Sequence, residues 1–125
     1  MKAIIAVNNL GFIGKNSGIP WPPNKADFKH FKEKTMGGKL LVGYNTHQTL
    51  PPLKGREIIL DRREDYHLSD FDKYWCIGGK KTYEKYCSQF TELHISRIND
   101  NTVGDTKYPD LSKLNPNCKI YEYNF

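Results

Sequence analysis

The stretch IPWPPNKADFKHFK, residues 19–32, organises this chain. Its three prolines exclude a regular helix at its start and favour an extended loop around Trp21. Asn24 is a residue type that caps helices well, so we expect a helix over residues 25–34. The stretch therefore predicts a stiff loop that leads directly into an amphipathic helix.

One carboxylate in this helix has two interpretations. At 3.6 residues per turn, Asp27 lies at the edge of an inward stripe. It either binds a ligand from a half-apolar pocket beside Trp21, or complements the positive N-terminus of the helix. The stretch alone leaves both open. We expect the inward stripe to hold Phe28, Phe31 and Thr35, and the outward face to hold Lys29, His30 and Glu33.

The composition predicts one small globular domain. The chain has 125 residues, of which 38% are hydrophobic and 26% charged. Neither a membrane span nor a signal peptide is recognisable. The net charge of +5 indicates either a nucleic-acid surface or a site for anionic small molecules. We favour the second, because the lysines and arginines are spread along the chain.

The cysteines and histidines point to a reducing compartment and to no metal. The three cysteines, Cys76, Cys87 and Cys118, are odd in number and show no close spacing, so we expect free thiols and a cytoplasmic protein. The four histidines are isolated along the chain and lack the spacing of metal ligands.

Short apolar runs alternate with short helical segments, which predicts an α/β fold. We expect one domain over residues 1–125, with a mainly parallel central sheet flanked by helices and an antiparallel strand at the C-terminal end. The expected strands are residues 2–7, 39–42, 57–60, 74–77, 92–98 and 119–125. The expected further helices are residues 46–50 and 80–90.

Three glycine-rich turns are candidate ligand contacts. The loop over residues 11–18 is either simple turn sequence or a flexible lid. The turns at residues 43–46 and 78–82 each join a strand to a helix, an arrangement that suits anions. The second is the stronger candidate because Lys80 and Lys81 follow its glycines.

With these residues placed, the chain resembles the dihydrofolate reductase family. The matching blocks follow the family's order over nearly the whole chain, and the ordered set is far more specific than any block alone. They are residues 4–7, 13–14, 19–21, 26–28 with 31–32, 42–43 with Thr46, 53–56, 77–79 with 83–84, and 104–106 with 108–109.

The resemblance implies a substrate site for dihydrofolate. Asp27 resembles the carboxylate that hydrogen-bonds the pterin ring, and Trp21 the loop tryptophan that holds a water above it. Arg56 resembles the arginine that clamps the carboxylate of the glutamate tail, although a turn arginine at the surface is the plainer interpretation. Ser96 stands where a threonine is linked to the acid by water. The expected ring walls are Ile5, Ala6, Phe28, Phe31 and Leu50.

The resemblance also implies that the cofactor is NADPH. The two glycine turns resemble those that hold the dinucleotide's phosphates, and Tyr83 resembles the tyrosine that packs near the nicotinamide. The expected contacts from these turns are Gly43, Tyr44, Asn45, Thr46, Ile77, Gly78, Gly79, Lys80, Lys81 and Thr82. The other expected contacts are Val7, Ile13, Gly14, Ile19, Leu60 and Arg62.

Departures from the family concentrate on the adenosine side. Tyr44 replaces an arginine that meets the 2′-phosphate, and Asp61 replaces a small hydroxyl residue, although Arg62 follows it. The segment of residues 63–74 is too short for the additional strand and helix that the family has at this place. The chain also lacks the family's final strand and the loop that clasps the lid, so it is similar to a minimised member.

These features imply a reductase that passes a hydride from NADPH to 7,8-dihydrofolate. The alternatives are a related pterin or pyrimidine reductase, and a catalytically weak relative kept as a folate-binding or structural subunit. We expect no nucleic-acid or membrane partner. We expect a monomer, with the open sheet edge as the route to a dimer.

Overall fold

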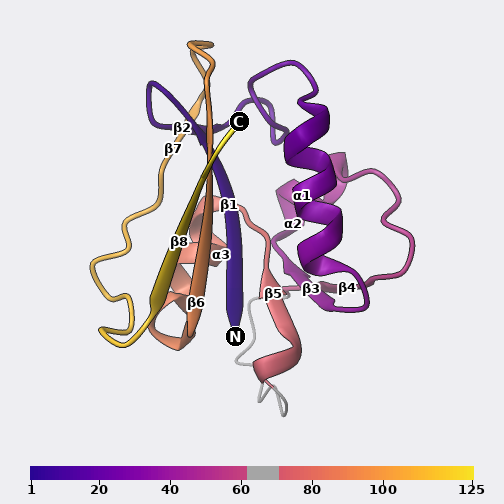
Figure 1. The fold of residues 1–125 in the computed structure, drawn as a ribbon, viewed down its shortest axis with the longest axis vertical. Helices are drawn as coiled ribbons and strands as arrows, with labels where there is room; N and C mark the ends of the chain where they lie inside the picture. The colour runs from indigo at the N-terminus through magenta and orange to yellow at the C-terminus, as the bar shows by residue number, and fades with distance from the viewer. Residues whose placement is uncertain (62–70) are drawn as a thin grey trace.

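Six parallel strands form the centre of the molecule (Figure 1). The computed structural model describes residues 1–61 and 71–125. Within these residues the sheet order is β4-β3-β5-β1-β6-β8. The strands are β1 (Lys2–Asn8), β3 (Lys39–Val42), β4 (Glu57–Leu60), β5 (Tyr74–Cys76), β6 (Glu92–Ile98) and β8 (Lys119–Asn124). The predicted α/β single domain with a mainly parallel sheet is confirmed.

Helices cover the two faces of this sheet. Helix α1 (Lys25–Thr35) lies on one face and α3 (Lys80–Tyr86) on the other, whereas α2 (Tyr44–Thr49) follows β3 directly (Figure 1). Strand alternation decides which side chains meet which helix. On β1, Ile4 packs with Leu40, Trp75 and the α1 residue Phe31. Its neighbours Ala3, Ile5 and Val7 pack on the other face with Tyr83 and Tyr86 of α3.

The elements begin and end close to their predicted positions, with small differences. Helix α2 occupies residues 44–49, and β5 ends at Cys76. The helix predicted to reach residue 90 is α3, followed by a 3₁₀ turn over Cys87–Gln89. A second 3₁₀ turn, Phe71–Lys73, leads into β5.

The predicted antiparallel strand at the C-terminal end is wrong, because β8 pairs in parallel with β6, from Glu92 opposite Lys119 to Arg97 opposite Asn124. The physical reason is the connection. Residues 99–118 run back along the domain before β8 begins, and such a length permits a crossover that a short hairpin turn does not. The direction of β8 therefore follows from the loop before it, and its alternation of residues is compatible with either direction.

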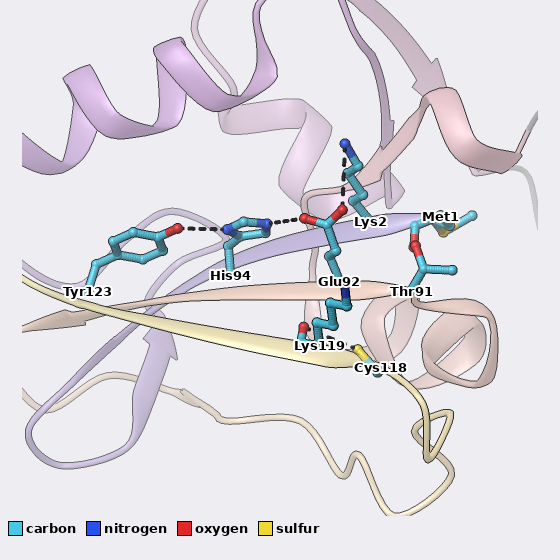
Figure 2. Close-up of polar contacts among 8 residues, drawn as sticks. All are labelled: Met1, Lys2, Thr91, Glu92, His94, Cys118, Lys119 and Tyr123. Atoms are coloured by element: carbon cyan, nitrogen blue, oxygen red, sulfur yellow. Dashed lines mark hydrogen bonds and ion pairs between the residues drawn. The ribbon is translucent and has the colours of Figure 1, made fainter.

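A chain of polar contacts ties β8 to the sheet (Figure 2). The ring nitrogens of His94 on β6 lie 3.0 Å from the Tyr123 hydroxyl and 3.0 Å from a Glu92 carboxylate oxygen. The other oxygen of that carboxylate lies 3.8 Å from the Lys2 ammonium. Burial lowers the pKa of His94, so the neutral ring accepts from Tyr123 and donates to Glu92. The edge strand is thus fixed by side chains as well as by its backbone pairing.

The same strand covers part of α1. The ring of His30 lies 4.2 Å from that of Tyr123 and 5.3 Å from that of Phe125, measured between centroids. The prediction that His30 is an outward-facing residue is therefore wrong, because the C-terminal strand packs over it. The inward stripe also differs, since Asp27 and Thr35 are buried whereas Phe28 is 48% exposed.

A separate two-stranded sheet holds the loop that precedes α1. β2 (Phe12–Gly14) pairs antiparallel with β7 (Thr106–Lys107), and neither segment was predicted to be a strand. The carboxylate of Asp105 accepts from the amide of Asn16 at 2.8 Å. On the other side the Thr49 hydroxyl of α2 donates to the Ser17 carbonyl at 2.6 Å. The loop over residues 15–18 is therefore held from two sides.

No described helix has the length and apolar character needed to cross a membrane.

Candidate active site

A cavity of about 1500 Å³ lies at the carboxyl ends of β1, β3, β4 and β5. Parallel sheets bind ligands at this edge, where the strand order reverses and the connections diverge. β1 lies between β5 and β6, so the chain leaves it in one direction and later returns on its other side. The topology therefore places the strand ends, the loop over residues 15–18 and the first turn of α1 around one space.

Asp27 is the buried acid of this cavity. It is 8% exposed and lines the cavity from the first turn of α1. The Asn24 side chain accepts from the Asp27 amide at 3.0 Å, which caps the helix as predicted and fixes the residue's position. Burial raises the pKa of the Asp27 carboxyl, and a hydrogen bond with Ser96 and the charge of His30 oppose this. Asp27 thus combines a site-facing carboxylate with a raised affinity for a proton.

Ser96 and Trp21, both predicted to act with Asp27, differ in whether they line the cavity. Ser96 on β6 is 1% exposed, lines the cavity and hydrogen-bonds Asp27. Trp21 is buried and does not line the cavity. Its indole nitrogen is buried and has no hydrogen-bond partner among the described residues. A buried N–H without a partner is uncommon in folded proteins.

The cavity walls are apolar and partly exposed. Ile19, Phe28 and Tyr44 are 44%, 48% and 63% exposed and all three line the cavity. A cluster of large exposed apolar side chains usually marks a binding surface. The remaining predicted ring walls, Ile5, Ala6, Phe31 and Leu50, line the same cavity. The arrangement suits a flat aromatic ligand that presents hydrogen-bond donors to Asp27.

The two glycine turns meet at the opposite part of the cavity. The Gly43 amide donates to the Gly78 carbonyl at 2.7 Å, and the Gly78–Gly79 peptide bond is cis. A β-carbon on Gly43 would lie 2.6 Å from the Thr82 hydroxyl, and one on Gly79 would lie 2.9 Å from the Thr46 hydroxyl. A side chain at either glycine would therefore crowd a threonine of the other turn.

The cations beside these turns complete an anion-compatible surface. Lys80 and Lys81 line the cavity together with Lys85. The Lys85 ammonium lies 3.1 Å from the Asp61 carboxylate, which also accepts from the Tyr86 hydroxyl at 3.1 Å. Among the described residues, the charge of Asp61 is thus compensated by its own neighbours. Lys80 and Lys81 have no ion pair in the part of the chain that the structure describes.

Arg56 lies outside the main cavity, in a second one beside it. Its Nε donates to the Lys54 carbonyl at 3.1 Å, and one terminal nitrogen lies 3.5 Å from the Thr35 hydroxyl. The guanidinium lies over the Phe31 ring at 5.9 Å from its centroid. Since Phe31 lines the main cavity, Arg56 stands at the end of the apolar wall.

Most predicted site residues come together, and three do not. Apart from Arg56 and Trp21, the one described residue of the prediction that lies off the cavity is Val7, which is 4% exposed in the core under α3. Arg62 lies outside the described residues. Tyr83 lines the cavity from α3, and its hydroxyl donates to the Ile4 carbonyl at 2.7 Å.

Several lining residues were not predicted from the sequence. They come mainly from β7 and from the neighbours of predicted segments: Ser17, Thr49, Leu53, Lys85, Asp105, Thr106 and Lys107. The pairing of β2 with β7 brings residues 105–107 to the cavity. Gly104-Asp105-Thr106 was recognised as a block, but its sequence gave no signal of that pairing. The described residues contain no group of three or more metal-ligating side chains.

Comparison with known proteins agrees with this geometry. The family model described as "Dihydrofolate reductase" matches residues 1–72 and 67–119. Dihydrofolate reductase type 8 of Escherichia coli is 29% identical over 150 aligned positions, covering 99% of this chain and 86% of that protein. Dihydrofolate reductase of Mycoplasma genitalium is 30% identical over 149 positions, covering 98% and 92%. Both alignments are longer than this chain, so both relatives contain segments that it lacks.

A solved structure shows the same fold. Dihydrofolate reductase from Enterococcus faecalis, complexed with NADP(H) and RAB-propyl, aligns with a TM-score of 0.74 at 26% identity. The alignment covers 89% of this chain and 77% of that one.

Proposed function

The chain belongs to the dihydrofolate reductase family, and we propose that it transfers a hydride from NADPH to 7,8-dihydrofolate to give tetrahydrofolate. The observation that carries the proposal is Asp27, a buried carboxylate that faces a cavity with exposed apolar walls. A site for a neutral apolar ligand would not need such an acid. An acid that served a structural ion pair would have a Lys or Arg side chain beside it.

The substrate half of the site follows from Asp27. Two carboxylate oxygens match the amino and ring N–H donors of a pterin, and Phe28 and Phe31 supply flat apolar contacts. Reduction of the ring also requires a proton. A carboxyl whose pKa is raised retains a proton more readily at neutral pH. The tail then leads along Phe31 toward Arg56.

The cofactor half suits a dinucleotide. The close backbone approach at Gly43 and Gly79, with Lys80 and Lys81 beside it, fits a phosphate-bearing ligand. When bound there, NADPH supplies the hydride. The chain's own residues would hold the phosphates and position the ligand, and Tyr83, whose hydroxyl donates to the Ile4 carbonyl, lines the cavity beside them.

Preference for NADPH over NADH rests on few groups in this chain. Tyr44 stands where the family often has an arginine, and the carboxylate of Asp61 would repel a 2′-phosphate. The pairing of Asp61 with Lys85 and Tyr86 reduces that repulsion. We propose that Arg62 meets the phosphate, and that the preference is about tenfold, the lower end for one charge-assisted contact.

The test is loss of NADPH absorbance when dihydrofolate is added to the purified protein. Turnover that depends on both compounds supports the proposal, and the same assay with NADH measures the preference. If the protein binds dihydrofolate but never consumes NADPH, it is a folate-binding relative and the proposed reaction is wrong. That second function is favoured by the adenosine side, where both Tyr44 and Asp61 depart from the family's residue types.

We also propose a cytoplasmic protein. Cys76 and Cys87 are buried free thiols and Cys118 is a partly buried one. Free thiols of this kind fit a reducing compartment. Burial raises the pKa of Cys76 to about 12, so this thiol stays protonated and unreactive.

A further inference from the structure

His30 lies one turn after Asp27 on α1, and both side chains lie against the last two strands of the sheet. Asp27 hydrogen-bonds Ser96 of β6, and the ring of His30 lies 4.2 Å from that of Tyr123 of β8, measured between centroids. Ser96 and Tyr123 are opposite each other in the pairing of these strands, and paired strands lie about 4.8 Å apart. Side chains three residues apart on a helix have a similar spacing, about 5–6 Å between β-carbons. Asp27 and His30 are therefore neighbours above two adjacent strands.

The C-terminal strand covers the His30 ring, and one ring nitrogen is unpaired. Phe125 lies 5.3 Å from this ring, again between centroids. The Tyr123 hydroxyl is 3.0 Å from Nδ1 of His94 (Figure 2), so it is already engaged. Nε2 of His30 is buried and has no hydrogen-bond partner in the described part of the chain. A cationic ring must donate from both nitrogens, so burial of an unpaired one favours the neutral ring.

The charged groups that face His30 act on it in both directions. Burial lowers the pKa of the ring, and the charge of Asp27, the largest opposing influence, raises it. Lys34 and His94 add to the lowering, whereas Glu33 raises the pKa by less than Asp27 does. The same influences reach Asp27 in reverse, since burial raises the pKa of its carboxyl and the charge of His30 lowers it. Each group therefore affects the protonation of the other.

We propose that Asp27 and His30 titrate as a coupled pair, and that β8 keeps their shared proton on Asp27 by covering His30. His30 is then a positioning residue, which acts on the reaction only through Asp27, and the inference rests on the proposed function. Two forms of the pair carry the same net charge: the neutral acid beside the neutral ring, and the carboxylate beside the cationic ring. Removal of water from both groups favours the first form, because neither group is charged in it. In that form the acid holds the proton that reduction of the pterin ring requires.

The alternative is that His30 only packs against β8. It predicts that the ring takes up its proton at the same pH whether or not Asp27 is charged. The proposal predicts a mutual effect, because a coupling free energy between two sites acts equally on both. A negative Asp27 must strengthen proton binding by His30 as much as a cationic His30 weakens proton binding by Asp27.

The first experiment follows the titration of His30 by NMR in the wild type and in Asp27→Asn, with the signal assigned by its absence from His30→Gln. Loss of the carboxylate charge should weaken proton binding by the ring about 3- to 10-fold, the range for unit charges about 6 Å apart in polar surroundings. The matched control is Glu33→Gln, which removes the acid three residues after His30 and should have a smaller effect. An unchanged His94 titration in the same spectra shows that each variant keeps its fold.

The second experiment measures kcat/KM for dihydrofolate against pH, because a purely structural role of His30 would not move the midpoint of that profile. Activity should fall as Asp27 loses its proton at rising pH. Phe125→Ser uncovers the His30 ring without removing the contact between Tyr123 and His94, and it should move this fall to lower pH. The double variant His30→Gln, Phe125→Ser has no ring that becomes cationic, so the fall should return to the wild-type pH or above it.

Each outcome supports or overturns the proposal. An unchanged titration of His30 in Asp27→Asn overturns the coupling and leaves the proposed function standing, as does an equal effect of Glu33→Gln, which assigns the change to overall charge. An unmoved profile in Phe125→Ser refutes the effect of the cover. A fall at lower pH that persists in the double variant shows that β8 acts on Asp27 without His30, which refutes the role of the ring. If the wild type consumes no NADPH with dihydrofolate, the proposed function fails and so does the pair's role in the reaction, whereas the NMR titration still tests the coupling.

Discussion

Asp27 carries an electrostatic cost that its neighbours offset only in part. Burial raises the pKa of its carboxyl, while the hydrogen bond with Ser96 and the charge of His30 lower it. For an acid with a raised folded-state pKa, the cost is present above that pKa and disappears on protonation. A residue that destabilises the fold in its ionised state is expected at a functional position.

We predict that Asp27→Asn lowers kcat/KM for dihydrofolate about 10²- to 10⁴-fold, the range for loss of a group that helps transfer a proton. The melting temperature at neutral pH should be equal to or above that of the wild type, because a neutral amide avoids the cost of a buried charge. Steady-state kinetics and thermal unfolding measure the two effects. An activity within a few-fold of wild type would remove Asp27 from the mechanism.

Arg56 separates binding of the tail from chemistry at the ring. We predict that Arg56→Leu raises KM for dihydrofolate about tenfold or more and leaves kcat nearly unchanged, since a lost charge-assisted contact acts on ground and transition state alike. Arg56→Lys, which keeps the charge but loses the planar fork, should recover only part of the affinity. A loss confined to kcat would contradict the assignment.

At the level of elements, the helices, the buried strands and the mainly parallel sheet were predictable, and the direction of the last strand was not. The Asn24 cap and the apolar runs at β1 and β3 are local signals. The direction of β8 depends on the path of residues 99–118, and β2 and β7 are too short to show a pattern without each other. The covering of His30 by Tyr123 and Phe125 likewise follows from where β8 runs.

The glycine turns give a prediction at this scale. Gly43→Ala should destabilise the fold by about 1–3 kcal/mol and raise KM for NADPH several-fold, because the new methyl group meets the Thr82 hydroxyl at 2.6 Å. The φ of Gly43 is −73°, so the effect comes from crowding and not from backbone strain.

The double variant Gly43→Ala, Thr82→Ala isolates this contact. It removes the hydroxyl that the methyl group meets, so it should be more stable than Gly43→Ala alone by a measurable coupling in chemical denaturation. Additive effects of the two substitutions would show that the turns do not constrain each other there.

For the whole molecule, the site's position was more predictable than its boundaries. The ordered blocks identified a family whose strands converge at one sheet edge, so residues as distant as Asp27 and Gly78 were expected around one site. Arg56 lines the smaller cavity together with Pro52 and Lys54, whereas other residues of the same segment line the main one. No local sequence pattern indicates which residues of this segment line which cavity.

The pH dependence of folding is also a property of the whole molecule. Burial lowers the pKa of both His30 and His94 from their ordinary value of 6.5. The unfolded chain therefore takes up protons first as the pH falls below about 7, and stability decreases from there toward the folded-state pKa values. The pKa of Glu92 is lowered from 4.5, chiefly by its hydrogen bond with His94, so its stabilising contribution is lost only at still lower pH. Asp27 acts in the opposite direction, because its protonation relieves a cost.

We accordingly predict that the free energy of unfolding decreases between pH 7.5 and pH 5.5, with each histidine contributing at most about 1.4 kcal/mol per pH unit. His94→Gln should be less stable at pH 7.5, because it disrupts the contacts that join Glu92 and Tyr123. Its stability should nevertheless change less over the same pH range, since one of the two titrating rings is gone. Chemical denaturation of both proteins at several pH values measures the slopes. Parallel slopes would mean that His94 has the same pKa in the folded and unfolded chain, and the decrease would then have to come from His30, which His30→Gln tests in the same way.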